Sequence, residues 1–193
     1  MTHCRRVITD TAFSTLGIGG LIAIFQTLGS LSLISGAFSS GEGTHGTMWM
    51  LAPFGASITL LLACPGSPLA RPYPALIGNV GSAAIGVGCQ KCFAANPELA
   101  FAAAIVLAVN YMSLVKAWHP PGGATAAIAV IGGKEIHDLG FMFAIYPIFL
   151  GTAWLLIVAA IRNAFINDSN KPSDEDLPLK PDFKCSECEG RLR

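Results

Sequence analysis

The residues most able to do chemistry lie in one string. Residues 118–126 read Trp-His-Pro-Pro-Gly-Gly-Ala-Thr-Ala, at the start of an apolar stretch. His119 is the ionisable member of this string, because histidine titrates near neutral pH. It could bind an anion when protonated or carry a coupled proton, and the two prolines after it stiffen the backbone and fix the direction of its ring. The alternative is an interfacial histidine that anchors a helix end beside Trp118.

A second string repeats part of this pattern earlier in the chain. Residues 53–57 read Pro-Phe-Gly-Ala-Ser and residues 121–125 read Pro-Gly-Gly-Ala-Thr. Proline suits the first turn of a helix, and the free N–H groups at a helix start favour a small anion. Two such starts meeting near the middle of a membrane would form an anion site, with Ser57 and Thr125 donating hydrogen bonds. The alternative is a pair of proline kinks satisfied by neighbouring groups, with each hydroxyl bonded to its own helix.

The predicted substrate-binding set combines the two strings with one polar residue between them. It consists of His119, Pro120, Pro121, Gly122, Gly123, Thr125, Pro53, Gly55, Ser57 and Asn79. Asn79 is also one of three amides in apolar stretches, with Gln26 and Asn110, and such amides more often join helices than bind a ligand. Lys116 could attract anions to the mouth of the site, but a lysine there more often reaches the membrane surface and only sets topology.

The composition is that of an integral membrane protein. Of the 193 residues, 52% are hydrophobic and 12% are charged, with a mean hydropathy of +0.56. A soluble domain carries about one-quarter charged residues, so this chain has half the usual charge. Its 21 glycines favour closely packed membrane helices. The formal net charge of +0 argues against a nucleic-acid partner.

Six stretches are apolar enough to enter a bilayer, where a spanning helix takes about 20 residues. They cover residues 11–41, 43–70, 72–90, 99–115, 120–133 and 139–161. The sequence therefore predicts an all-α, polytopic transmembrane helix bundle of five to six membrane segments, two of them interrupted by Pro and Gly. Residues 1–11 form an N-terminal flank, residues 12–162 the transmembrane domain, and residues 163–193 a polar tail with too little apolar surface to become ordered.

The cations and the two strings together predict an inverted arrangement. With the N-terminus inside, the cytoplasmic side, or its organelle equivalent, receives the cations Arg5, Arg6, Arg71, Lys116 and Arg162. A cut near residue 96 gives two units of three segments, which would face opposite ways across the membrane. Such an inverted 3+3 repeat occurs in many transporters, where interrupted segments mark the binding site.

The six cysteines indicate neither a metal centre nor a cofactor site. Cys185 and Cys188 form one Cys-x-x-Cys pair in the polar tail. Structural zinc needs four ligands, and the tail offers no second pair and no histidine. We therefore expect two unpaired thiols there, and no metal or cofactor.

The strings also carry a resemblance to a known family. His-Pro-Pro at residues 119–121 resembles the signature of the HPP family of integral membrane proteins. Pro-Phe-Gly-Ala-Ser at residues 53–57 and Ser-Pro-Leu-Ala at residues 67–70 resemble two further motifs of that family. The sequence departs from the family pattern at Arg71, where glutamine is common, and at Asn79, where a histidine is common. The resemblance implies a helical membrane protein and nitrite transport, which is associated with plant members at the chloroplast envelope and with cyanobacterial members.

These observations favour a transporter or channel for a small inorganic anion, and the resemblance makes nitrite the leading substrate. One alternative is a membrane structural or assembly protein without a transported substrate, whose glycines serve only helix packing. A membrane-embedded enzyme is disfavoured, because its chemistry wants clustered carboxylates or a nucleophile with its base, and no predicted segment holds a carboxylate. The expected partners are lipid and the small anion, and a homo-oligomer stays open. The host membrane is either the plasma membrane or an organelle envelope.

Overall fold

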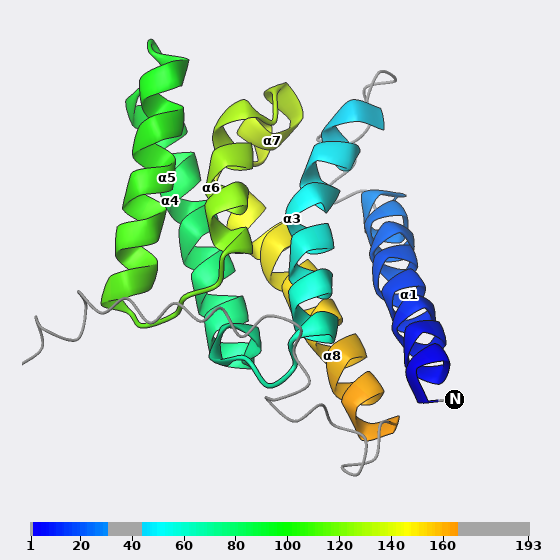
Figure 1. The fold of residues 1–193 in the computed structure, drawn as a ribbon. Coiled ribbons are helices and arrows are strands. Elements are labelled where there is room, and N and C mark those ends of the chain that lie inside the picture. Colours follow the sequence, from blue (N-terminus) through cyan, green and yellow to red (C-terminus); the bar gives the residue numbers. More distant parts are fainter. Residues whose placement is uncertain (1, 31–43, 166–193) are drawn as a thin grey trace, which may run out of the picture.

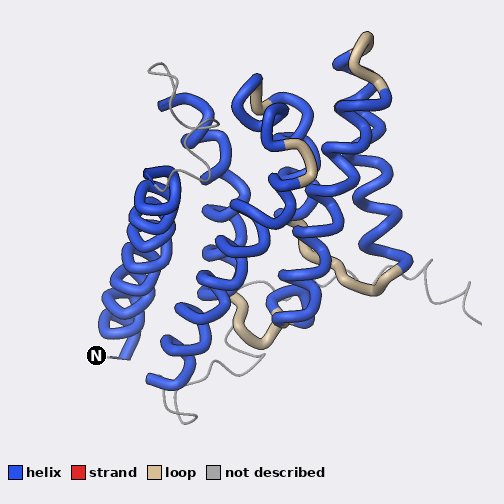
Figure 2. Tube along the Cα trace, turned by 180° about the vertical axis from the view of Figure 1, so that it is seen from behind, coloured by secondary structure: helices blue, strands red, loops and turns tan. Residues whose placement is uncertain are grey.

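The computed structural model describes residues 2–30 and 44–165, and every regular element in these two ranges is a helix (Figures 1 and 2). The long helices are α1 (Thr2–Ser30), α3 (Thr44–Ala63), α4 (Asn79–Cys92), α5 (Pro97–Leu114), α6 (Pro121–Ile131) and α8 (Leu150–Phe165). Each of the six predicted apolar stretches therefore overlaps one long helix. Short elements join them: the 3₁₀ turn η1 (Pro68–Ala70), the π-helical turns η2 (Pro74–Gly78) and η3 (Ala144–Phe149), and the helix α7 (Lys134–Leu139), which the sequence had not predicted.

Within residues 2–30 and 44–165, two helical segments are long and apolar enough to cross a bilayer by length and composition, Pro97–Leu114 and Ala144–Phe165. Shorter apolar helical segments lie at Thr9–Ile24, Ala52–Ala63 and Pro121–Ile131. The last of these is α6, whose 11 residues rise about 16 Å. Because the hydrocarbon layer is about 30 Å thick, α6 alone reaches only halfway. The number of membrane spans therefore stays a prediction.

The packing joins helices from the two halves of the chain. Helix α4 packs against α5 and α6, whereas α8 packs against α1 and α3, and α3 meets α6. Successive long helices run in alternate directions, and α1 begins at the end of the molecule where α8 ends (Figure 1). The turn after α3 and the link between α5 and α6 lie toward that same end, so the segments carrying Arg71, Lys116 and Arg162 share one end of the bundle.

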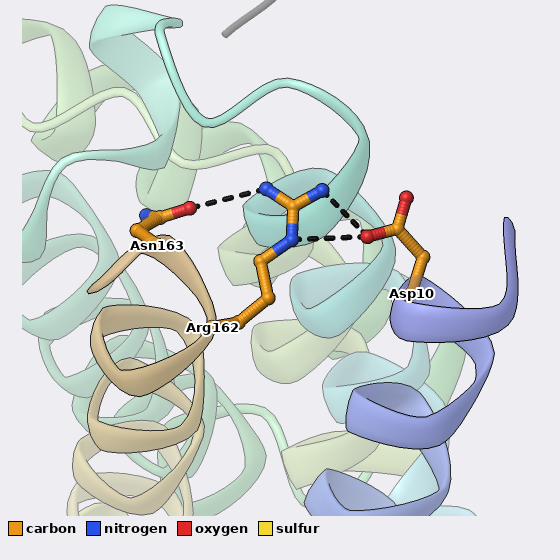
Figure 3. A network of polar contacts seen from close by, with 3 residues as sticks. All are labelled: Asp10, Arg162 and Asn163. Carbon is orange, nitrogen blue, oxygen red and sulfur yellow. Dashed lines mark hydrogen bonds and ion pairs between the residues drawn. The ribbon is translucent and has the colours of Figure 1, made fainter. Parts of the chain in front are cut away.

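A buried ion pair ties α1 to α8 (Figure 3). The Arg162 guanidinium donates to Oδ1 of Asp10 from Nε at 2.9 Å and from an Nη at 2.5 Å. A second Nη donates to Oδ1 of Asn163 at 3.1 Å. Arg162 is only 2% exposed, while Asp10 is 32% exposed. From the sequence, Arg162 was predicted only as a cation at the end of the last apolar stretch. The structure adds Asp10 of α1 as its partner.

One predicted helix start is wrong. Pro53 was expected to begin a helix, but it lies inside α3, which begins at Thr44. A proline removes one backbone hydrogen bond from a helix, and that loss is tolerated where neighbouring groups supply replacements. Pro121 does occupy the first turn of α6, as predicted. Only one of the two similar strings therefore provides a helix N-terminus.

Candidate functional site

Three of the motifs noted in the sequence meet at one imidazole ring. His119, from His-Pro-Pro, is fully buried at 0% exposure. Its Nε2 lies 3.1 Å from Oγ of Ser57, which ends Pro-Phe-Gly-Ala-Ser on α3. Its Nδ1 lies 3.1 Å from the carbonyl oxygen of Leu69, in Ser-Pro-Leu-Ala. Residues 50 and 62 positions away in the sequence thus bracket the ring on its two nitrogens.

Local turns hold both sides of this contact. Ser67 caps the turn η1, because its Oγ accepts from the Leu69 N–H at 3.2 Å, and this fixes the direction of the Leu69 carbonyl. On the other side, the His119 carbonyl accepts from the Gly122 N–H at 2.8 Å. Gly78 lets the two segments approach, since a Cβ there would lie 3.0 Å from the Cβ of His119.

The hydrogen-bond partners assign the tautomer of His119. A carbonyl oxygen can only accept, so Nδ1 must carry a hydrogen and donate it to Leu69. In the neutral ring Nε2 is then an acceptor, and the Ser57 hydroxyl donates to it. Because the Leu69 carbonyl holds the hydrogen on Nδ1, the ring can take up a further proton only on Nε2, which faces the Ser57 hydroxyl.

A second hydrogen-bonded group joins α6, α4 and α8. The Thr125 hydroxyl lies 3.1 Å from two acceptors, Oδ1 of Asn79 and the Pro121 carbonyl of its own helix. The amide nitrogen of Asn79 donates to Oγ1 of Thr152 at 3.3 Å. Thr125 and Thr152 are 0% exposed and Asn79 is 1% exposed. The bond of Thr125 to its own helix was one of the two predicted alternatives, and the structure adds the contact with Asn79; donation to a substrate stays a prediction.

Ser82 lies next to this group on α4. Its hydroxyl is buried and has no hydrogen-bond partner among the residues that the structure describes. It faces the start of α6, because a Cβ on Gly122 would lie 2.9 Å from the Ser82 oxygen. The sequence gave no reason to single out Ser82 as a binding residue, since small hydroxyl residues are common in packed membrane helices.

The N-terminus of α6 is not an open anion site in this conformation. The Gly122 N–H donates to the carbonyl of His119, and the Gly123 N–H donates to Pro120 at 3.1 Å. Pro121 has no N–H to offer. The predicted pair of free helix starts is therefore not formed, both because these amides are occupied and because Pro53 does not begin a helix.

The other predicted site residues divide between the buried centre and its edge. Pro53 and Pro121 are buried, whereas Pro120 is exposed. A Cβ on Gly55 or Gly123 would meet no atom within 4 Å, so helix packing does not require glycine at either position.

The remaining polar candidates lie away from this centre or outside the description. The Asn110 amide donates to the Val106 carbonyl of its own helix at 2.8 Å, so it neither joins helices nor faces the centre. Lys116 and Arg71 are exposed. The Gln26 side chain and the Cys-x-x-Cys pair of the tail lie outside the described residues.

The arrangement can exchange hydrogen bonds and one proton, but it holds no fixed charge. A serine hydroxyl that donates a hydrogen bond to an imidazole is also the arrangement in which histidine activates serine as a nucleophile. Acyl transfer further needs access for a substrate and donors for an oxyanion, whereas Ser57 and His119 are both fully buried. The described residues therefore leave Ser57 and His119 no exposed surface at which a substrate could be attacked.

The described residues form an apolar helical bundle around these polar groups, and the family of the chain identifies it as a membrane protein. The chain belongs to the HPP family, since residues 4–172 match the model of the HPP transmembrane region. This match is wider than the stretch of the strings that carried the resemblance.

The curated relatives are proteins of Dictyostelium discoideum. Two of them, each named only as a transmembrane protein, are 35% identical over 129 residues and 34% identical over 126 residues. These matches cover 65% and 64% of this chain but only 41% and 44% of the relatives, so the chain spans less than half of their length. No solved structure matches the chain.

Proposed function

We propose that this chain carries a small inorganic anion across the membrane, with nitrite as the leading substrate. One observation carries the proposal: five polar side chains, each buried to 1% exposure or less, form two hydrogen-bonded groups that adjoin where Gly78 precedes Asn79, and Ser82 is buried beside them. The five side chains are those of Ser57, Asn79, His119, Thr125 and Thr152. Hydrogen bonds between membrane helices contribute only about 0.6 kcal/mol each, so stability is a weak reason for burying five such groups.

The chemistry of these groups suits a small anion. Hydroxyl, amide and imidazole N–H groups can all donate to an oxygen, and none of the five side chains is a carboxylate that would repel one. None carries a permanent charge, which keeps binding weak enough for release on the far side. The choice of nitrite rests on the resemblance of the strings to the HPP family.

A second internal echo supports an inverted repeat, the architecture that many carriers share. Residues 73–79 read Tyr-Pro-Ala-Leu-Ile-Gly-Asn, and residues 146–152 read Tyr-Pro-Ile-Phe-Leu-Gly-Thr. The two segments overlap the π-helical turns η2 and η3, which lead into α4 and α8. Their last residues, Asn79 and Thr152, hydrogen-bond to each other. The two units would be α1–α3–α4 and α5–α6–α8, and such units make the chain multi-pass.

The helix contacts follow the same exchange between units. Helix α4 packs on α5 and α6, and α8 packs on α1 and α3, so each unit would lend its third helix to the other. The two glycines of this echo each lie against the other unit: a Cβ on Gly78 would meet His119, and one on Gly151 would meet the ring of Phe54. Movement of one unit against the other would therefore change the surroundings of both strings, as alternating access requires.

Reconstitution into liposomes tests the proposal. Purified protein should take up sodium nitrite faster than protein-free liposomes, and Asn79→Leu should slow this uptake because it removes the amide between Thr125 and Thr152. Asn110→Leu is the matched control, since Asn110 bonds only its own helix. Uptake equal to that of protein-free liposomes, for nitrite and for other small inorganic anions, would exclude the proposed transport.

The alternative function, that of a membrane structural or assembly protein without a transported substrate, is supported by the tight contacts between helices. Gly86 of α4 lies directly against the backbone of Ala126 in α6, so that a Cβ could not be added. A pure assembly protein would show no anion flux, and His119→Ala would then impair only its accumulation or its assembly in the membrane.

A further inference from the structure

We propose that a proton is the co-substrate: each anion that enters the buried centre is accompanied by a proton, which His119 takes up on Nε2. This inference rests on the proposed anion transport and names what travels with the anion. The observation behind it is that the two ring nitrogens face partners of different chemistry, the Leu69 carbonyl and the Ser57 hydroxyl, each at 3.1 Å.

In the neutral state the Ser57 hydroxyl is committed to His119. Because the Leu69 carbonyl holds the hydrogen of Nδ1, the lone pair of Nε2 accepts the only hydrogen that the Ser57 hydroxyl can give. Ser57 is 0% exposed, so no water competes for this bond. The neutral pair therefore offers an incoming anion only oxygen lone pairs, which repel it.

Protonation of Nε2 reverses this hydrogen bond. The new N–H donates to the Ser57 oxygen, while Nδ1 keeps its bond to Leu69. The Ser57 hydrogen is then free to rotate toward an anion. One proton thus supplies both a positive charge and a free donor, and hydrogen bonds between charged partners are the strong ones. Because coupling between two bound species is reciprocal, the anion favours the proton as much as the proton favours the anion.

The balance of charge in the buried centre also requires a proton to accompany the anion. An isolated ion is costly in a buried, apolar site, whereas an ion pair is tolerated. The groups around the ring are neutral: Ser57 on α3, the Leu69 carbonyl, and the backbone at Gly78 before α4. An anion in this centre therefore needs the imidazolium, and the imidazolium needs an anion.

The other titratable groups near these elements do not replace His119. Arg71 and Lys116 are exposed, and the Tyr73 hydroxyl donates to the Val115 carbonyl at 3.1 Å. The Tyr111 hydroxyl donates to the Ile77 carbonyl. The remaining groups are Cys64 after α3, the residues Cys89, Lys91 and Cys92 in the last turns of α4, and Tyr146 of η3. Within the described part of the chain, none of them forms a hydrogen bond or an ion pair with His119.

Proteoliposomes loaded with a pH-sensitive dye test the inference. With sodium nitrite added outside and the membrane potential clamped by potassium and valinomycin, the wild-type protein should acidify the interior as nitrite enters. Its nitrite uptake should not respond to the membrane potential, because the proton cancels the charge of the anion. Above the titration of His119, apparent affinity should fall about tenfold for each unit by which the pH rises. Protein-free liposomes measure the passive entry of the protonated acid.

Three variants separate the proton from the fold. In His119→Gln the amide can donate to Leu69 and accept from Ser57 but cannot take up a proton, so any remaining nitrite flux should be independent of pH. Ser57→Thr keeps the hydroxyl and should keep the pH dependence. His137→Gln should behave as wild type, because His137 bonds the Val130 carbonyl at 2.8 Å, outside this centre.

Each result decides between the two proposals. Wild-type nitrite flux that carries charge and moves no proton overturns the proton inference and leaves anion transport standing. Absence of flux in the wild type overturns both. If His119→Gln does not accumulate in the membrane, the voltage measurement on the wild-type protein decides alone.

Discussion

Two buried polar regions of this bundle are built in opposite ways. Where α1 meets α8, Arg162 and Asp10 bring full charges together at 2.5–2.9 Å (Figure 3). Around His119 and Asn79 the groups are neutral and the distances are longer, 3.1–3.3 Å. The first region satisfies its charges within the fold. The second satisfies its hydrogen bonds but contains one ring that can become charged.

This difference separates a contact that stabilises the fold from a centre that can bind a passing ion. A guanidinium that is 2% exposed must keep its carboxylate, since a buried charge without a partner is expensive. The ion pair therefore stabilises the contact between α1 and α8. Neutral groups can exchange hydrogen-bond partners without leaving a buried charge unpaired. A site for a passing ion requires such exchange.

The largest effect should come from breaking the ion pair on its exposed side. Asp10→Ala should lower the free energy of unfolding by about 3 kcal/mol, because it leaves Arg162 buried without a counter-charge. Arg162→Met should cost about 1 kcal/mol, since the remaining carboxylate is 32% exposed and can be hydrated. Unfolding midpoints in detergent measure both variants, and equal losses would remove the asymmetry. Nitrite flux per folded molecule should change in neither.

The packing beside the neutral centre should respond to one methyl group. Gly122→Ala should destabilise by about 2 kcal/mol, because the new Cβ would lie 2.9 Å from the Ser82 oxygen and 3.1 Å from the Gly78 carbonyl. Gly123→Ala, its neighbour, meets nothing within 4 Å and should gain up to about 1 kcal/mol of helix propensity. The two changes in unfolding midpoint should have opposite signs. A loss in both would mean that the space beside Gly123 is already filled.

The smallest change in stability, with a clear change in transport, should follow from one hydroxyl. Thr125→Val keeps the shape but removes the donor to Asn79, at a cost of about 1 kcal/mol, and should slow nitrite uptake severalfold. Thr59→Val is the matched control, because the exposed Thr59 hydroxyl donates only to Gly55 in its own helix at 2.8 Å. Equal uptake in the two variants would remove Thr125 from the site.

Local chemistry was predictable from the sequence, and the long-range pairing was not. His119 and Asn79 could be chosen because each is an unusual residue in an apolar stretch, and Ser57 and Thr125 because each ends one of the two Pro-x-Gly-Ala strings. Their partners lie 46 to 73 residues away and follow from helix packing alone. Thr152 was missed because one threonine in a long apolar segment is unremarkable until the Tyr-Pro echo is noticed.

Backbone context explains why the two Pro-x-Gly-Ala strings behave differently. Pro120 and Pro121 both lack a backbone N–H, which a helix tolerates only in its first turn, so α6 begins there. Pro53 follows residues 50–52, Met-Leu-Ala, which favour a helix, and α3 continues through it. Asp10 was missed as a partner because it lies just before the first predicted apolar stretch, whereas α1 already begins at Thr2.

The most direct test of the buried centre counts the protons that the purified protein takes up when it binds nitrite. In weakly buffered detergent solution above neutral pH, we predict about one proton taken up for each nitrite bound. His119→Gln should take up none, and His137→Gln should match the wild type. Nitrite bound by the wild-type protein with no uptake of protons would contradict a centre that becomes charged only together with its anion.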